Sequence, residues 1–163
     1  MTLPKDLEDP RVTLLALLSA EWLPANVPSV GTPAFRTEWR GTMDDTPVVT
    51  ITNRDDVDIA ARGYSSIRGD GSGVASRKRG SVFVNCWSGV FATGTRAANP
   101  NPKTQAKEMW AEVERIVIAH ATGSGDLEFL RTDGPSSQDE GTDAEDLHRT
   151  FGRIEYEYQL TPA

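Results

Sequence analysis

Apolar residues that recur every three or four positions predict two amphipathic helices in this chain. The longer one runs from Asn101 to Ala121, where Asn101 suits the N-cap, Pro102 the first helical position and Gly123 a left-handed C-cap. About twenty residues at 1.5 Å each give a rod of roughly 30 Å, which is long enough to cover one face of a small sheet. Its apolar stripe consists of Ala106, Met109, Trp110, Val113, Ile116 and Val117.

A shorter and more apolar helix is predicted from Pro10 to Leu23, with Asp9 as its N-cap. Further leucines widen its apolar stripe, so we expect it to lie in the core or at a subunit contact. Prolines at positions 24, 28 and 33 exclude a helix before Phe35 and favour an extended connection. The stripe consists of Val12, Leu15, Ala16, Leu18 and Trp22.

Alternation of apolar and polar residues predicts strands on either side of the long helix. The segment 81–92 is the strongest strand, and the segment 151–160 alternates cleanly between a buried face and a face that is wet or in an interface. Further strands are predicted at 34–40, 47–52 and 126–131, and a turn at 53–56. One face of each main strand is formed by Val82, Val84 and Cys86, and by Ile154, Tyr156, Tyr158 and Leu160.

This order of elements predicts a single α/β (α+β) domain over residues 1–163, with two main helices packed on a mixed or mostly antiparallel sheet. A chain of 163 residues with 37% hydrophobic content is enough for one core and short for two. The core is predicted to contain Val82, Val84, Trp110, Val113, Val117, Ile154, Tyr156 and Tyr158.

Two long loops of opposite charge are predicted in this domain. A basic, flexible loop near 62–80 has a glycine-rich middle that lacks the strand and helix of a phosphate-binding loop. Its cations could contact a subunit or partner, contact DNA, or be simply solvated, and we expect the subunit or partner contact. An acidic loop near 133–146 has no apolar periodicity. The basic residues are Arg62, Arg68, Arg77, Lys78 and Arg79.

The net charge of −7 disfavours nucleic-acid binding by the surface as a whole, because an acidic surface repels phosphate. There is no run of eighteen apolar residues and no basic-then-apolar start, so we expect neither a membrane span nor a signal peptide. We therefore expect a soluble, intracellular protein. Scarce lysine with abundant aspartate and threonine is typical of halophilic proteins, and an ordinary acidic protein with a GC-rich codon bias is the alternative.

The residues that most often carry chemistry occur here without companions. Cys86 is the single cysteine and falls in an apolar strand, so a buried structural role is expected. Neither His120 nor His148 has a partner at metal-ligand spacing, and His120 is placed to interact with the last carbonyls of the long helix. The sequence predicts no catalytic, cofactor-binding or metal-binding residues, which favours a structural or binding role over an enzyme.

The succession of helix, strands, basic loop, strong strand, long helix, strand, acidic loop and final strand resembles the tail terminator family. These tail completion proteins occur in long-tailed phages and haloarchaeal tailed viruses. The resemblance is carried by patterns of apolar positions over nearly the whole chain. Its parts are 11–23, 82–91, 103–121, 127–130, and Leu147-His148-Arg149-Thr150-Phe151 leading into 154–158.

The resemblance implies a virion protein of the tail or neck, assembled in the host cytoplasm. It implies a hexameric ring that caps the tail tube, joins it to a head-completion or neck protein, and lets DNA pass without sequence-specific binding. The family has no catalytic residues, and no membrane is involved. The two long loops depart from its compact pattern, so another head-tail connector is an alternative. A nucleic-acid-binding module that uses the basic residues, or an unrecognised enzyme, are two further alternatives.

Overall fold

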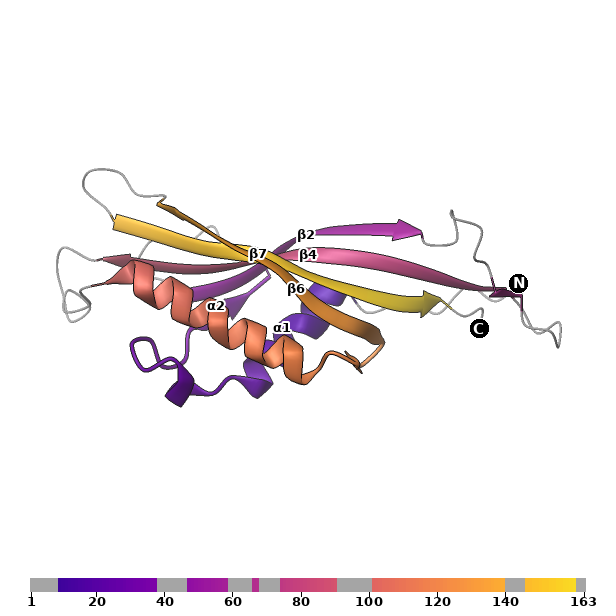
Figure 1. Ribbon diagram of the computed structural model, residues 1–163, viewed down its shortest axis with the longest axis horizontal. Coiled ribbons are helices and arrows are strands. Elements are labelled where there is room, and N and C mark those ends of the chain that lie inside the picture. The colour runs from indigo at the N-terminus through magenta and orange to yellow at the C-terminus, as the bar shows by residue number, and fades with distance from the viewer. Residues whose placement is uncertain are drawn as a thin grey trace.

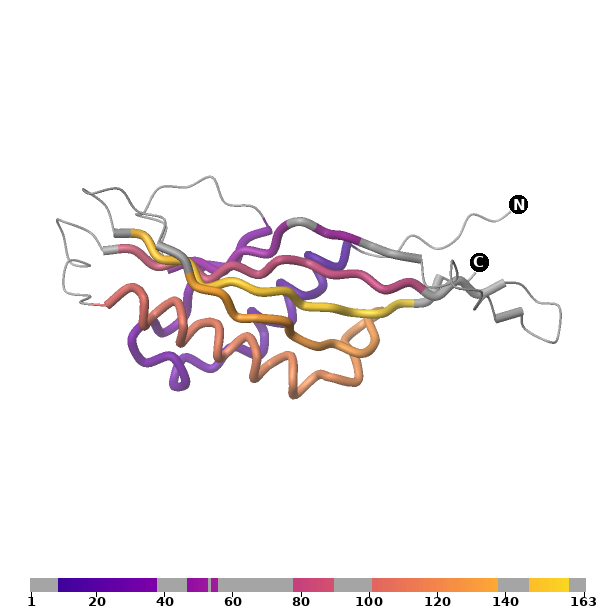
Figure 2. The backbone as a smooth tube through the Cα atoms, turned by 45° about the horizontal axis from the view of Figure 1, so that its top comes forward, coloured from indigo at the N-terminus to yellow at the C-terminus, as the bar shows by residue number. Residues whose placement is uncertain are grey.

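A long, curled sheet with two helices packed on one of its faces forms the body of the molecule (Figure 1). The computed structural model describes residues 9–37, 47–58, 66–67, 74–90, 101–139 and 146–160. A second view shows the same two layers, with the strands running past the helices at one end (Figure 2). The predicted fold class, a single α+β domain with a mixed, mostly antiparallel sheet, is confirmed.

Both predicted helices form, and their N-caps are the predicted ones. Helix α1 spans Pro10–Glu21 after Asp9, whose carboxylate accepts a hydrogen bond from the backbone N–H of Arg11 at 3.0 Å. Helix α2 spans Pro102–Ala119, and the side chain of Asn101 accepts from the N–H of Thr104 at 3.1 Å. The predicted C-cap of α2 is wrong, because His120 closes the helix and Gly123, at φ 136°, begins the next strand.

The sheet is antiparallel throughout its described part except at one edge, where β1 runs parallel to β2. The strand order is β1-β2-β4-β7-β6-β5, with the short β3 paired to β4. Strands β4 and β7 are the central pair. The strands are β1 (Ala34–Arg36), β2 (Val48–Asp58), β3 (Ser66–Ile67), β4 (Val74–Val90), β5 (Gly123–Ser124), β6 (Leu127–Asp139) and β7 (Asp146–Leu160), and η1 (Pro24–Asn26) is a 3-10 turn.

Three segments that were predicted as turn or loop belong to strands. Strand β2 continues through 53–56, and a register shift after Thr52 absorbs the polar residues there. The basic loop becomes β4 from Val74 onward, and the acidic loop is β6 as far as Asp139. Backbone pairing along these long neighbouring strands outweighs the local preference of polar residues for loops. The remaining loop residues, 62–65, 68–73 and 140–145, lie outside the described residues.

The core lies between the helices and the sheet, and all eight predicted core residues are buried there. Trp110 of α2 fits against the backbone of β7 at Gly152, where an added Cβ would lie 2.4 Å from the indole Cη2 atom. A side chain at this position would therefore collide with the ring that fills the centre of the core. None of the helices in the described ranges is both long and apolar enough to cross a membrane.

A buried carboxylate fastens the end of α1 to α2. Glu112 accepts hydrogen bonds from the N–H of Leu23 at 2.9 Å, from the Asn26 amide at 2.9 Å, and from the Arg115 guanidinium at 2.7 and 2.9 Å. Burial alone would raise the pKa of Glu112, but these hydrogen bonds outweigh it and hold the pKa below its usual value. The helical layer is thus positioned by directional bonds as well as by packing.

Candidate partner-binding face

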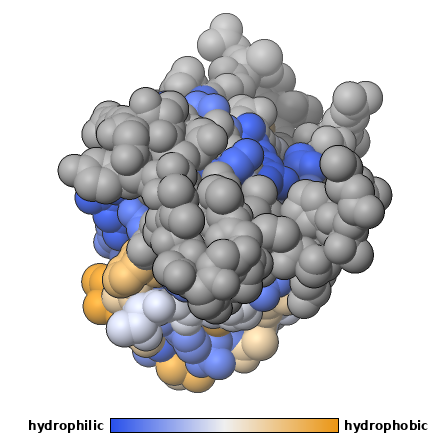
Figure 3. Space-filling model, turned by 90° about the vertical axis from the view of Figure 1, so that its right-hand side faces the viewer, coloured by the Kyte–Doolittle hydropathy of each residue, from blue (hydrophilic) through white to orange (hydrophobic). Residues whose placement is uncertain are grey.

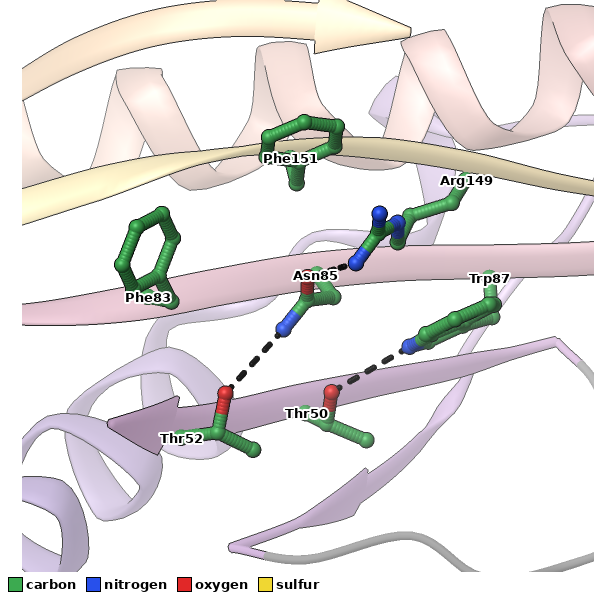
Figure 4. A pocket seen from close by; sticks show the side chains of 7 residues that line it. All are labelled: Thr50, Thr52, Phe83, Asn85, Trp87, Arg149 and Phe151. Atoms are coloured by element: carbon green, nitrogen blue, oxygen red, sulfur yellow. Dashed lines mark hydrogen bonds between the residues drawn. The ribbon is translucent and has the colours of Figure 1, made fainter. Parts of the chain in front are cut away.

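The face of the sheet that points away from the helices, called here the open face, carries a shallow groove. Its volume is about 320 Å³, and it crosses three adjacent strands, β2, β4 and β7 (Figure 4). We call it the open-face groove. It is lined by Thr50, Thr52, Phe83, Asn85, Trp87, Arg149 and Phe151.

Strand alternation places these residues on one face. Because consecutive side chains of a strand point to opposite sides, Val82, Val84 and Cys86 enter the core while the residues between them face outward. The register sets Thr50 beside Asn85, and Asn85 beside Phe151, so that a row of outward side chains crosses the sheet. The groove is therefore built on three adjacent strands in the middle of the sheet.

Hydrogen bonds tie the polar side chains of the groove across strands (Figure 4). The amide of Asn85 donates to the Thr52 hydroxyl at 3.4 Å, and its oxygen accepts from the Arg149 guanidinium at 3.4 Å. The indole N–H of Trp87 donates to the Thr50 hydroxyl at 3.3 Å. These links hold the side chains of Trp87 and Arg149 in defined orientations.

Cations lie over aromatic rings along the same face. The guanidinium carbon of Arg149 is 4.4 Å from the ring centre of Phe151 and 5.2 Å from that of Trp87. The guanidinium carbon of Arg153 is 4.7 Å from the ring centre of Phe83. Contacts of this kind each contribute about 0.5–1 kcal/mol at exposed sites and present positive charge on a flat, half-buried surface.

Towards the other end of the strands the open face is ion-paired instead. Arg79 donates to Glu157 at 3.1 Å, and Arg131 donates to Glu155. No carboxylate is among the described lining residues of the groove. The open face thus has a cationic, aromatic half and a half in which charges of both signs are paired. The first half combines arginines with half-buried aromatic rings, residue types that are enriched at protein–protein interfaces.

The predicted contact residues are only partly within the described structure. Arg62 and Arg68 lie outside it, and for Arg77 the structure describes the backbone in β4 but not the side chain. Lys78 and Arg79 are consecutive in that strand, so they point to opposite faces and do not form one cluster. Arg79 belongs to the ion-paired half of the open face.

Cys86 and His148 lie in strands of the sheet, and His120 ends helix α2. Cys86 is completely buried, and burial raises the pKa of its thiol, which keeps the group neutral. His120 is the C-cap residue of α2, and its backbone N–H donates to the carbonyl of Ile116 at 3.1 Å. The histidine side chain was predicted to interact with the last carbonyls of the helix, but its Nε2 atom lies 3.7 Å from the Glu21 carboxylate. His148 pairs with Ser88 in the sheet. Within the described ranges, no three His, Cys, Asp or Glu side chains are grouped as metal ligands.

The sequence analysis did not single out Arg149, Phe151 or Asn85. The sequence does indicate part of this face, because Arg149, Phe151 and Arg153 are at alternate positions of the last strand and so share one side of it. The polar residues Thr50 and Asn85 sit at outward positions of otherwise apolar strands, and both are nearly fully buried. Pairing between distant strands brings them together, and the strand pattern alone does not give that register.

Comparison with known proteins adds a likeness in fold. No protein-family model matches the chain, and no curated protein matches it in sequence. Among solved structures, it is similar to a chain from the virion of a native gene transfer agent particle. The TM-score is 0.50 at 15% sequence identity, and the match covers 91% of this chain and 94% of that chain. At this identity the similarity shows that the two chains share a fold.

Proposed function

We propose that this protein is a structural component of a virion or virion-like particle. The observation that carries the proposal is the fold likeness to a chain of a gene transfer agent virion, which extends over nearly the full length of both chains. A match over 91% of this chain leaves little of the fold outside the shared part. The order of elements that resembles tail terminators supports the same class.

Within that class we propose the finer role of a tail terminator. Copies of the chain form a ring, proposed to be hexameric, that caps the tail tube and seats a head-completion or neck protein while DNA passes through. The open-face groove supports this role, because half-buried aromatic rings and arginines are enriched where proteins meet. The basic residues Arg62, Arg68, Arg77, Lys78 and Arg79 are proposed to contact a subunit or partner.

The class is tested by finding where the protein resides. Particles from cells that produce this protein are purified, and their components are identified by mass spectrometry and by cryo-EM. We expect the chain in the particle, at the junction of tail and head. Its absence from purified particles would contradict the virion role.

The finer role is tested by removing the protein from a producing strain. A missing terminator should leave tails of uncontrolled length together with heads that lack tails. Normal tails with leaking or unjoined heads would favour another head-tail connector. The mass of the purified chain, measured by light scattering, reports whether copies associate without other proteins.

A further inference from the structure

The outward side chains of strand β7 form a pattern that is complementary to its own reverse. Alternate positions on the open face carry Arg149, Phe151, Arg153 and Glu155. Read in the opposite direction, the same positions carry a carboxylate, a cation, a ring and a cation. If two such strands face each other in antiparallel directions, every arginine therefore meets either a carboxylate or an aromatic ring.

These side chains keep surface that a second molecule can contact. Arg153 is exposed, and Arg149, Phe151 and Glu155 are half-buried. Both helices pack on the other face of the sheet (Figure 1). Viewed from the end in Figure 3, hydrophobic surface lies in the lower, helical layer, and the coloured surface on the side of the sheet is hydrophilic. A contact on the open face is therefore selected by charge and aromatic stacking more than by apolar area.

We infer that two copies of the chain pair through their open faces. A two-fold axis lies between the two sheets and crosses the strands at the level of Gly152. Arg149 of each copy then lies opposite Glu155 of the other, and Arg153 opposite the ring of Phe151. The contact joins the same patch on both copies, so it closes after two. The inference goes beyond the proposed function, because a ring would use other surfaces.

The neighbouring strands fit the same axis without a clash of charges. Gly152 pairs with Val84 of β4, and Val84 pairs with Ile51 of β2, so the axis passes these residues as well. No two like charges face each other among the described open-face residues nearest to the axis. The pairs across it are Phe83 with Asn85 in β4, Thr50 with Thr52 in β2, and Asp133 with Ser136 in β6.

Other axes between the same two faces are less favourable. An axis at Phe151 sets Arg149 opposite Arg153 twice, and an axis at Arg153 sets two copies of that arginine against each other. An axis along the strands sets every arginine opposite itself. Like charges held opposite each other disfavour these arrangements strongly. An axis at Thr150 or Ile154 keeps either the ring contacts or the carboxylate contacts and loses the other, so the pattern selects Gly152.

The contact adds to interactions that each chain already makes. The Arg149 guanidinium stays over Phe151 and Trp87, and Glu155 still accepts from Arg131, so the carboxylate is flanked by two arginines. The patch from 149 to 155 measures about 20 Å along the strand and about 15 Å across four strands. A stable complex buries roughly 800 Å² per partner, which is more than this patch offers, so the pair should be weak and should form as concentration rises.

Charge exchange tests the pairing in sedimentation experiments from micromolar to millimolar concentration. Arg149→Glu sets two carboxylates against each other and Glu155→Arg sets two cations, so each variant should associate at least tenfold more weakly than the wild type. An equal mixture of the two variants should associate like the wild type, because each chain then carries the charge that the other lacks. Glu157→Arg removes the ion pair with Arg79 but lies outside the patch, and this control should associate normally.

The double variant Arg149→Glu/Glu155→Arg separates the contact from folding, because it exchanges both charges within one chain and should pair like the wild type. A wild type that stays monomeric, or single variants that pair as well as it does, would overturn the inference. A mixture that stays monomeric would overturn the axis at Gly152. None of these results bears on the virion role, which depends on finding the chain in particles. A chain that pairs in solution but is absent from particles would support the pairing and contradict the proposed function.

Discussion

The two faces of strand β4 follow different rules although they alternate residue by residue. On the covered face Val82, Val84 and Cys86 are completely buried and pack against α2 and β7. On the open face Phe83 and Trp87 keep part of their surface exposed. Asn85, although nearly buried, and these two rings are held by hydrogen bonds and cation contacts. The covered face depends on how well apolar side chains fill the core, whereas the open face depends on directional hydrogen bonds and cation contacts.

The two faces should contribute differently to stability and to the proposed recognition of a partner. Removing a group from the covered face leaves a cavity or an unpaired charge and costs stability. Removing one from the open face loses contacts of a few tenths to about 1 kcal/mol each, so the fold should survive. Variants on the covered face should therefore lower the melting temperature strongly. Variants on the open face should leave it nearly unchanged and should act on assembly instead.

The largest effect is expected from a charge in the covered face. Val113→Asp places a carboxylate at a completely buried position of α2, and should lower the free energy of unfolding by roughly 4 kcal/mol or more. Ile118→Asp on the exposed side of the same helix, where the side chain is 72% exposed, is the control and should change it by at most about 0.5 kcal/mol. Denaturant unfolding measures both. Equal losses would show that the helix face is wrongly assigned.

The next effect comes from adding a single methyl group. In Gly152→Ala the new Cβ would meet Trp110 Cη2 at 2.4 Å and the Asp133 carbonyl at 2.5 Å, so the variant should lose about 1–3 kcal/mol of stability. Trp110→Phe in the same chain shortens the ring and should recover part of the loss. Thermal unfolding of the single and double variants checks this coupling, and strictly additive effects would contradict it.

An effect of similar size is expected from Glu112→Gln, in which one oxygen remains to accept hydrogen bonds. The loss should be about 1.5–3 kcal/mol at neutral pH, as for hydrogen bonds to charged groups. Since the folded state lowers the pKa of Glu112, its stabilising contribution is present above the unfolded pKa of about 4.3 and is lost as pH falls through the folded value. Stability measured between pH 3 and 7 should fall more steeply for the wild type than for Glu112→Gln.

On the open face, Arg149→Ala should change the free energy of unfolding by only about 0.5–1.5 kcal/mol, because it removes two partly exposed cation contacts and a long hydrogen bond. If the groove meets a partner, the same variant should be incorporated into particles at least tenfold less well. Quantitative mass spectrometry of purified particles measures this. Thr13→Ala on α1 is a control outside the groove. If Arg149→Ala lost much stability but was incorporated normally, the proposed division of roles between the two faces would be contradicted.

The smallest effect on stability is expected from changing Arg77, Lys78 and Arg79 together to Ser. The described ion pair in this set, between Arg79 and Glu157, is exposed and contributes about 0–1 kcal/mol. If these residues contact a subunit or partner, the variant should fold normally and assemble poorly, and filter binding should show no change in affinity for DNA. Normal assembly with lost DNA binding would favour a nucleic-acid module.

The sequence predicted the covered face well and the open face poorly. Helical spacing identified Val113 and Val117, and strand alternation identified Ile154 and Tyr156. Burial of one face imposes a regular spacing of apolar residues, and this spacing can be read directly from the sequence. The continuation of β2 through Asp55 was missed, since aspartate favours turns locally and only pairing with β4 overrides it. The groove depends on registers between strands distant in sequence. The register shift of β6 between Glu128 and Arg131 depends on which of three neighbouring apolar residues the core has room for.

Both sheet edges in the described part are poorly suited to continue into another sheet. At β6 the ladder is interrupted by two register shifts, and Pro135 lacks a backbone N–H. At β2 the edge beyond the short β1 has its own register shift and the exposed Asp55. Interruptions and charges of this kind are how natural proteins avoid aggregation through strand pairing. Pairing of two copies edge to edge through these strands is therefore disfavoured, so that any association proposed for this chain would depend on contacts between side chains.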